Sequence, residues 1–116
     1  MHVNKAVLIK LHKTRRKIFR EVERELSKPR RKRLEVNVEK IYRLLKDSEN
    51  AIVAGKVIGI LSKKLVENEK KKIEVYANGF TKRAYESLIN NGLVAKKFDD
   101  LTVEELKNLK NLRLIK

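Results

Sequence analysis

Residues 28–33, Lys-Pro-Arg-Arg-Lys-Arg, constrain the fold of this chain more than any other segment. Five of these six residues are cationic and none is apolar, apart from the proline ring, so the segment cannot form part of a core. We call it the basic strap and expect it to lie on the surface. Pro29 is the only proline of the chain, and it should end a preceding helix at about Ser27 and Lys28, because the residue before a proline avoids helical geometry.

Before the basic strap, apolar residues recur at the spacing of two amphipathic helices. The first stripe consists of Val3, Val7, Leu8 and Leu11, and the second of Ile18, Phe19, Val22 and Leu26. Thr14 stands where the N-cap of the second helix is expected. Cations fill most of the remaining positions, so both helices should be basic on their outer side.

After the basic strap, short apolar runs alternate with amphipathic segments. Residues 51–54 and 57–60 are rich in β-branched side chains, and Gly55-Lys56 between them indicates a turn joining two buried strands. Before these strands we expect an extended segment at 34–36 and a helix capped by Asn37. After them we expect an exposed charged linker at 62–71, a half-buried strand at 72–77, a turn at 78–79 and a helix from Thr81 to Asn91-Gly92. The chain should end with a strand at 93–95, a helix opened by a Thr102–Glu105 capping box and a strand at 112–115.

Positive charge is concentrated near the start of the chain. The formal net charge is +15, and residues 1–33 carry 13 Lys and Arg against three Glu, a net charge of +10. Such an excess repels itself unless a polyanion compensates it, which favours binding to RNA or DNA over an anionic membrane. On charge alone, the first third of the chain should be partly frayed when no nucleic acid is bound.

Several classes of site have no support in the sequence. Without cysteine there can be no disulfide and no thiolate-bound zinc, and no apolar run approaches the ~18 residues of a membrane span. His2 and His12 lack a ligand cluster, and Asp99 and Asp100 lack a catalytic partner. Residues 55–59 do not have the order of a phosphate-binding P-loop. We therefore expect no enzymatic activity and no metal.

Aromatic side chains are predicted to fill the core rather than to stack on bases. Phe19, Tyr42, Tyr76, Tyr85 and Phe98 fall on apolar stripes, whereas the environment of Phe80 is left open. In the helix after Thr81, the inward positions are expected to be Ala84, Tyr85, Leu88 and Ile89.

Three ordered motifs narrow the kind of partner. They are LSKPRRKR at residues 26–33, EVNV at 35–38 and IVAGKVIG at 52–59. In this order they resemble the archaeal and eukaryotic large-subunit ribosomal protein numbered eighteen, a family related to the bacterial large-subunit protein numbered fifteen. The resemblance continues to the end of the chain, with the departure that Ala54 stands where the family usually has proline, which should loosen a turn before Gly55.

The resemblance implies an α/β fold, an irregular layered strand–helix body with a basic helical N-terminal segment. We expect one ribosomal-protein domain over residues 1–116, with 1–36 as the helical RNA-contacting segment and 37–116 as the α/β body. The implied function is that of a structural constituent of the large ribosomal subunit in the cytoplasm. The implied partners are large-subunit ribosomal RNA and neighbouring large-subunit ribosomal proteins, with no membrane and no small-molecule substrate. The resemblance also implies that no cofactor is bound.

We expect phosphate contacts from cations at the start of the second helix and in the basic strap. Lys56, next to Gly55, should add a supporting contact. The expected contacts are Arg15, Arg16, Lys17, Lys28, Arg30, Arg31, Lys32, Arg33 and Lys56. Two alternatives remain open on the residues alone. A DNA-binding or chromatin-type protein would share the charge, and an RNA-processing enzyme would need a carboxylate or histidine cluster that the sequence does not show.

Overall fold

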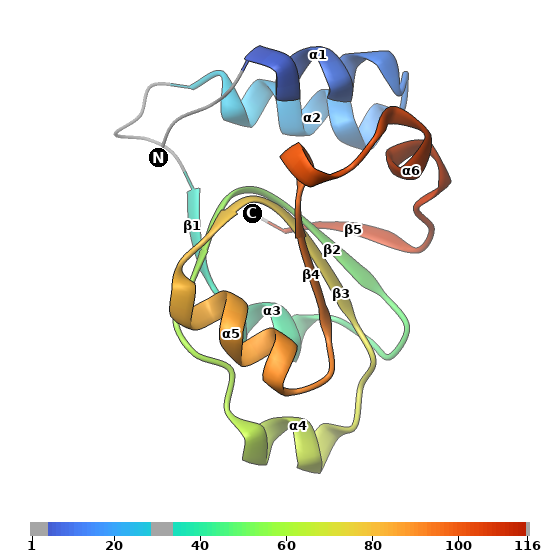
Figure 1. Cartoon of the computed structure of the whole chain (residues 1–116). Helices are drawn as coiled ribbons and strands as arrows, with labels where there is room; N and C mark the ends of the chain where they lie inside the picture. Colours follow the sequence, from blue (N-terminus) through green and yellow to red (C-terminus); the bar gives the residue numbers. More distant parts are fainter. Residues whose placement is uncertain (1–4, 29–33, 116) are drawn as a thin grey trace.

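The computed structural model describes residues 5–28 and 34–115, in which helices and strands alternate along most of the chain. The elements are α1 (Lys5–Lys13), α2 (Lys17–Leu26), β1 (Leu34–Asn37), α3 (Val38–Leu44), β2 (Asn50–Ile58), α4 (Lys63–Glu69), β3 (Glu74–Phe80), α5 (Lys82–Asn90), β4 (Val94–Lys97), the 3₁₀ helix η2 (Phe98–Asp100), α6 (Val103–Asn108) and β5 (Leu112–Ile115). The predicted α/β class is confirmed (Figure 1).

The strands form one sheet in which every pair is parallel, in the order β1-β2-β3-β4. β2 lies in the middle of the sheet. One of its sides pairs with β3, and the other is shared by two strands, β5 along residues 50–53 and β1 along residues 55–58. The last strand of the chain thus returns to pair with β2 at the edge of the sheet, where it lies end to end with the first.

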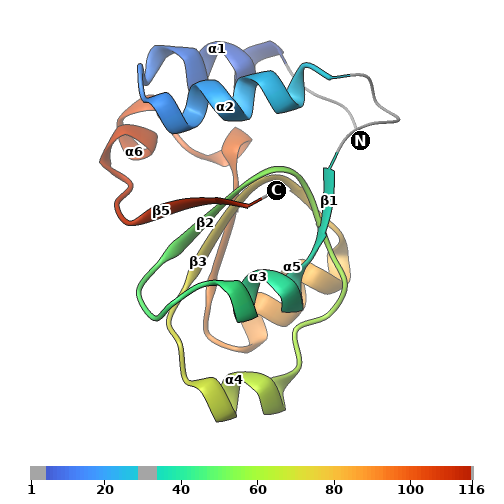
Figure 2. The same cartoon turned by 180° about the vertical axis from the view of Figure 1, so that it is seen from behind.

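Helices cover both faces of this sheet. α1 and α2 lie on one face with η2 and α6, and α3 and α5 lie on the other (Figure 1; Figure 2). Because successive strand residues point to opposite faces, Ala51 and Val53 pack with α3 and α5, whereas Ile52 and Tyr76 pack with α1, α2 and α6. Each face therefore has its own hydrophobic core, and the architecture is a three-layer α/β/α arrangement.

The expected turn at Gly55-Lys56 is wrong, because β2 runs without interruption from Asn50 to Ile58. Against β3, however, the register shifts between Val53 and Lys56, so one extra residue of β2 forms a β-bulge. A Cβ atom at Gly55 would stand 2.1 Å from the carbonyl oxygen of Leu34. The glycine therefore allows β1 to approach the bulge closely, and Ala54 lies in a buried strand rather than in a loosened turn.

Other elements of the body differ from the prediction in extent. The expected turn at Asn78-Gly79 is wrong, since β3 continues to Phe80 and Gly79 pairs with Lys56 of β2. The charged linker at 62–71 contains α4, which buries none of its residues, so its predicted exposure is confirmed and its helix was missed. No apolar stripe marks α4, so the sequence pattern did not distinguish this helix from a coil.

Most helix boundaries follow the predicted caps. The side chains of Asn37 and Thr81 accept backbone N–H groups at the starts of α3 and α5, and Thr102 and Glu105 form a reciprocal capping box at α6. The prediction for Thr14 is wrong. Arg16 is the N-cap of α2, and the Thr14 hydroxyl instead donates to the carbonyl oxygen of Leu11 at the end of α1.

Candidate nucleic-acid interface

Helices α1 and α2 form an antiparallel pair whose apolar side packs on the sheet (Figure 1). The predicted stripes are confirmed where the structure describes them, with full burial at Val7, Leu11, Phe19, Val22 and Leu26. Val3 lies outside the described residues. Since five large side chains are removed from water, this helical pair is an integral part of the fold and not an appended basic tail.

Two cations of the pair are bound to the C-terminal part of the chain. Nη1 of Arg16 donates to the carbonyl oxygens of Leu106 at 3.0 Å and Leu109 at 2.7 Å, at the end of α6. The Arg16 guanidinium also lies 5.6 Å from the centre of the Phe19 ring. Nζ of Lys10 donates to the carbonyl oxygen of Asp99 at 3.0 Å. These bonds fix the orientation of the helical pair, because each joins it to a segment about 90 residues further along the chain.

The outward side of α2 and of the residues that follow it carries a row of exposed cations, which we call the cationic stripe. It consists of Lys17, Arg20, Arg24 and Lys28. Their spacing of three, four and four residues places them on one side of the helix, opposite the buried stripe. Arg24 pairs with Glu21 at 3.5 Å and Lys28 with Glu25 at 2.9 Å, both on the surface. Such exposed pairs contribute little and are readily exchanged for a phosphate.

The remaining predicted contacts have different surroundings. Arg15 is exposed in the link between α1 and α2, where its φ of 55° places it in the left-handed region. Lys56 is half-buried in β2, in register with Glu35 of β1 and on the opposite side of the sheet from the neighbouring Val57. Arg30, Arg31, Lys32 and Arg33 lie outside the described residues.

Sequence reasoning did not select several exposed cations of the helical pair. Arg20 and Arg24 complete the cationic stripe, and Lys5 and Lys13 are exposed on α1. The helical period of α2 contained the signal for Arg20 and Arg24, since every residue opposite the apolar stripe must face solvent.

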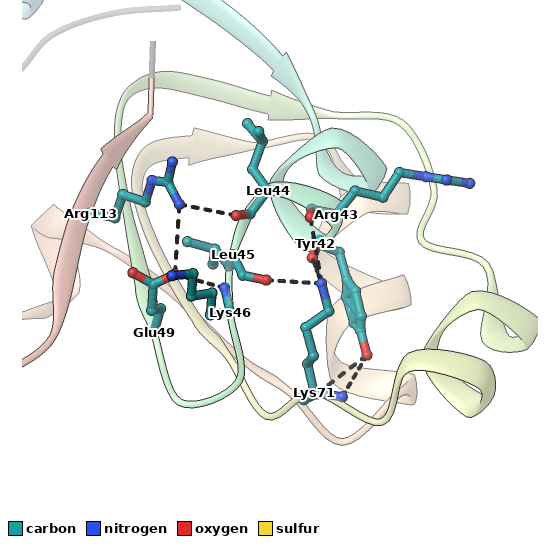
Figure 3. A network of polar contacts seen from close by, with 8 residues as sticks. All are labelled: Tyr42, Arg43, Leu44, Leu45, Lys46, Glu49, Lys71 and Arg113. Atoms are coloured by element: carbon teal, nitrogen blue, oxygen red, sulfur yellow. Dashed lines mark hydrogen bonds and ion pairs between the residues drawn. The ribbon is translucent and has the colours of Figure 1, made fainter.

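A second group of cations stabilises the opposite layer and is shown in Figure 3. Nζ of Lys71 donates to the carbonyl oxygens of Tyr42 and Leu45 at 2.9 and 2.8 Å, at the carboxyl end of α3, and lies 5.2 Å from the centre of the Tyr42 ring. Arg113 of β5 donates to the carbonyl oxygen of Leu44 at 3.1 Å. Cations satisfy the last carbonyls of a helix and interact favourably with its dipole, so these two side chains have an internal role.

The aromatic side chains divide between core and surface. Phe19, Tyr42, Tyr76 and Phe98 are buried, as predicted. The prediction is wrong for Tyr85 and for Ile89, which are 45% and 44% exposed on the outer side of α5. Burial raises the pKa of the Tyr76 hydroxyl above its ordinary value, and the hydrogen bond that this hydroxyl donates to Glu74 raises it further.

Sites of other kinds find no further support. In residues 5–28 and 34–115, no group of three or more His, Asp or Glu side chains could hold a metal ion. None of the helices in the described part of the chain has the length and apolar character that a membrane span requires. The P-loop interpretation fails as well, because Gly55 and Lys56 belong to a continuous strand.

No protein-family model matches the chain. Similar proteins are found among archaea, and the three that follow are each called large ribosomal subunit protein eL18. The protein of Sulfurisphaera tokodaii is 35% identical over 107 residues, which cover 91% of this chain and 84% of the relative. That of Nanoarchaeum equitans is 37% identical over 111 residues, covering 93% and 86%. That of Archaeoglobus fulgidus is 36% identical over 90 residues, covering 78% and 72%.

Proposed function

The chain belongs to the family of large ribosomal subunit protein eL18, and from this premise we propose that it is a structural constituent of the large subunit that binds large-subunit ribosomal RNA. Its place is then in the ribosome, in the cytoplasm, beside other large-subunit proteins. It acts by binding and not by catalysis, without a cofactor or a small-molecule substrate.

The outward side of the helical pair α1–α2 is the observation that carries this proposal. The cationic stripe, Arg15 and the α1 lysines face solvent, while Lys10 and Arg16 hold the pair in place through backbone carbonyls. Because different cations do the anchoring, the exposed ones are available to an external polyanion. RNA is the polyanion that the family name implies.

The mode of binding follows from the chemistry of these side chains. Lys and Arg neutralise phosphates and release the counterions condensed on the RNA, and the arginine fork binds a phosphate through two parallel hydrogen bonds. Side chains do not reach the base edges in the deep major groove of A-form RNA. The helical pair therefore recognises the shape and backbone of folded RNA more than its sequence.

The proposed phosphate contacts are the cations predicted from the sequence, extended by the two arginines that complete the stripe. They are Arg15, Arg16, Lys17, Arg20, Arg24, Lys28, Arg30, Arg31, Lys32, Arg33 and Lys56. For Arg16 the contact would use nitrogens other than Nη1, which is bound to the end of α6. For Lys56 the half-buried position supports a peripheral role.

The salt dependence of RNA binding tests this proposal. One variant carries Arg15→Gln and Lys17→Gln, a second carries Arg30→Ala, Arg31→Ala and Arg33→Ala, and affinity for large-subunit RNA is measured at several salt concentrations. The slope of log K against log salt should become shallower by about one unit for each phosphate that the variant no longer neutralises. A slope unchanged in both variants would refute phosphate binding by these cations.

A matched control removes two cations from the other end of the molecule. Lys63 and Lys64 are exposed on α4, which lies at the opposite end from α1 and α2 in both views (Figure 1; Figure 2). The variant with Lys63→Gln and Lys64→Gln has the same net charge as the Arg15–Lys17 variant but should keep the wild-type slope. An equal change in both variants would indicate non-specific attraction instead of a defined face.

Sedimentation separates ribosomal RNA from duplex DNA as the partner. In a sucrose gradient of cell extract, the protein should travel with the large subunit, and excess duplex DNA should not displace it. Absence from the large-subunit fraction together with tight binding to duplex DNA would favour the chromatin-type alternative.

A further inference from the structure

A second surface with the properties of a nucleic-acid contact lies at the carboxyl ends of β3 and β4. A pocket of about 380 Å³ opens there, lined by Phe80, Thr81, Lys82, Tyr85, Lys97 and Asp100. These residues come from the end of β3, the first turn of α5, the end of β4 and η2. Ligands of parallel α/β sheets commonly bind outside the carboxyl ends of the strands, so the location itself is a favourable one.

The pocket contains an aromatic ring that is both held in place and accessible. Tyr85 is 45% exposed, and its ring meets that of Phe80 edge to face, with 6.0 Å between the centroids and 72° between the planes. The Phe80 ring is itself half-buried and packs against the core of the α3–α5 face. A ring fixed in this way loses little entropy when a flat ligand stacks on it.

The charges around the ring favour an anionic ligand that has one hydrogen-bond donor. Lys82 and Lys97 line the pocket, and Arg83 lines the adjoining hollow beside Gly59. Asp100 is the one acidic residue among the lining side chains, and it lies exposed at the end of η2. An ionised carboxylate accepts hydrogen bonds and cannot donate them.

We propose that this pocket binds one unpaired nucleotide of large-subunit ribosomal RNA, with the base stacked on Tyr85, the phosphate on Lys82 and Lys97, and an amino group of the base donating to Asp100. The proposal rests on the proposed function, which it extends from the helical pair to the carboxyl ends of β3 and β4. Unpaired bases stacked on aromatic side chains are the usual basis of sequence-specific RNA recognition. Cytosine, adenine and guanine carry an exocyclic amino group that suits Asp100, whereas uracil has no amino group and only its ring N3–H as a donor.

Tyrosine fluorescence provides a direct readout of the pocket. The chain has no tryptophan, and two of its three tyrosines, Tyr42 and Tyr76, are 0% and 3% exposed, so Tyr85 is the one that an added base can reach. The full chain is titrated at low salt with single-stranded oligo(C) and with oligo(U) of the same length. Both probes have the same charge and the same ring size. They differ in the amino group from which Asp100 would accept a hydrogen bond.

The expected result is quenching of tyrosine emission at lower concentrations of oligo(C) than of oligo(U). Asp100→Asn should abolish this preference. Asp99→Asn is the matched control, because it removes the same charge from the neighbouring exposed residue outside the pocket and should keep the preference. Tyr85→Phe should remove the quenching and preserve RNA binding, whereas Tyr85→Ala should weaken oligo(C) binding roughly 5- to 100-fold.

Several outcomes would overturn the proposal. If Tyr85 emission is unaffected while the helical pair binds RNA with the salt slope described above, the pocket is not a nucleotide site and the proposed function stands. If no RNA binds at all, the proposed function fails first. If Tyr85→Ala and Ile89→Ala both reduce incorporation into large subunits but neither changes RNA binding, this surface of α5 contacts a neighbouring protein instead.

Discussion

The two helical layers cover opposite faces of the same sheet but present different chemistry to solvent. The α1–α2 layer exposes the cationic stripe and only one large apolar side chain among its described residues, Ile9, at 55%. The α3–α5 layer exposes Leu44, Tyr85 and Ile89, and cations are fewer on it. Charge in the sequence therefore predicts a binding face on the first layer, and it predicts none on the second.

Cations also serve different purposes in the two layers. In each layer some of them bind carbonyl oxygens at the end of a helix, Arg16 at α6 and Lys71 at α3. The α1–α2 layer has many more cations than this internal role requires, and the surplus faces solvent. A count of Lys and Arg cannot separate the two uses, because the separation depends on which carbonyls lie near in three dimensions.

The largest expected effect tests whether the core under α1 and α2 contributes as much to stability as the core under α3 and α5. Phe19 of α2 and Leu88 of α5 are both 0% exposed. Phe19→Ala and Leu88→Ala should lower the free energy of unfolding by about 3–5 and 2–5 kcal/mol respectively, because each leaves a cavity in a packed core. Chemical denaturation measures both. A decrease below about 1 kcal/mol for Phe19→Ala alone would mean that the helical pair is only loosely attached.

A smaller effect is expected where a cation has an internal role. Arg16→Lys keeps the positive charge but removes the planar fork that reaches Leu106 and Leu109, so it should cost about 1–2 kcal/mol of stability. The salt slope of RNA binding should stay unchanged under conditions in which the variant is folded, because lysine keeps the positive charge. Unchanged stability would contradict the internal role of the Arg16 fork.

The capping box of α6 should stabilise the α1–α2 layer more than the α3–α5 layer. Thr102→Ala removes the side chain that accepts the Glu105 N–H and should destabilise the protein by about 1 kcal/mol. Because α6 packs with α1 and binds Arg16, amide exchange should accelerate in α6, α1 and α2 before it does in α3 and α5. Equal acceleration in both layers would show that the sheet couples them fully.

The smallest effect concerns pH and the same capping box. Hydrogen bonds from the Thr102 backbone N–H and, to a smaller extent, from the Thr102 side chain lower the pKa of Glu105 below its ordinary value. The folded state therefore favours the ionised carboxylate, and this stabilisation is fully present above the unfolded pKa and lost as pH falls through the folded one. A comparison of unfolding midpoints with those of Glu105→Gln should show a difference at neutral pH that disappears in acid. A difference that grows in acid would contradict the sign.

Local signals predicted much of this fold. The apolar stripe of α2, the caps at Asn37 and Thr81 and the Thr102–Glu105 box depend on residues within one or two helical turns of each other, so a single sequence contains them. The family resemblance carried by three motifs is confirmed, while the relation to the bacterial protein numbered fifteen stays a prediction. The nine phosphate contacts predicted from the sequence also stay predictions.

The errors arise where a residue's role depends on a distant partner. Gly55 has the character of a turn residue, but β1 approaches it closely in the middle of a strand. Tyr85 has the spacing of a core residue, but the inward side of α5 is filled by Ala84 and Leu88. The charge-based expectation of a partly frayed first third stays a prediction, and the burial of Phe19 and Val22 leads us to expect protected amides in α2.

The sequence by itself determined that this chain has a basic helical start, an α/β body and a charge suited to a polyanion, since period, caps and net charge are properties of neighbouring residues. Tertiary structure alone decided that β2 is one strand shared by β1 and β5, that Arg16 and Lys71 bind helix ends, and that Tyr85 faces solvent beside Lys82. The physical reason is that strand register, carbonyl partners and exposure are fixed by contacts between segments far apart in the chain, which no local pattern encodes.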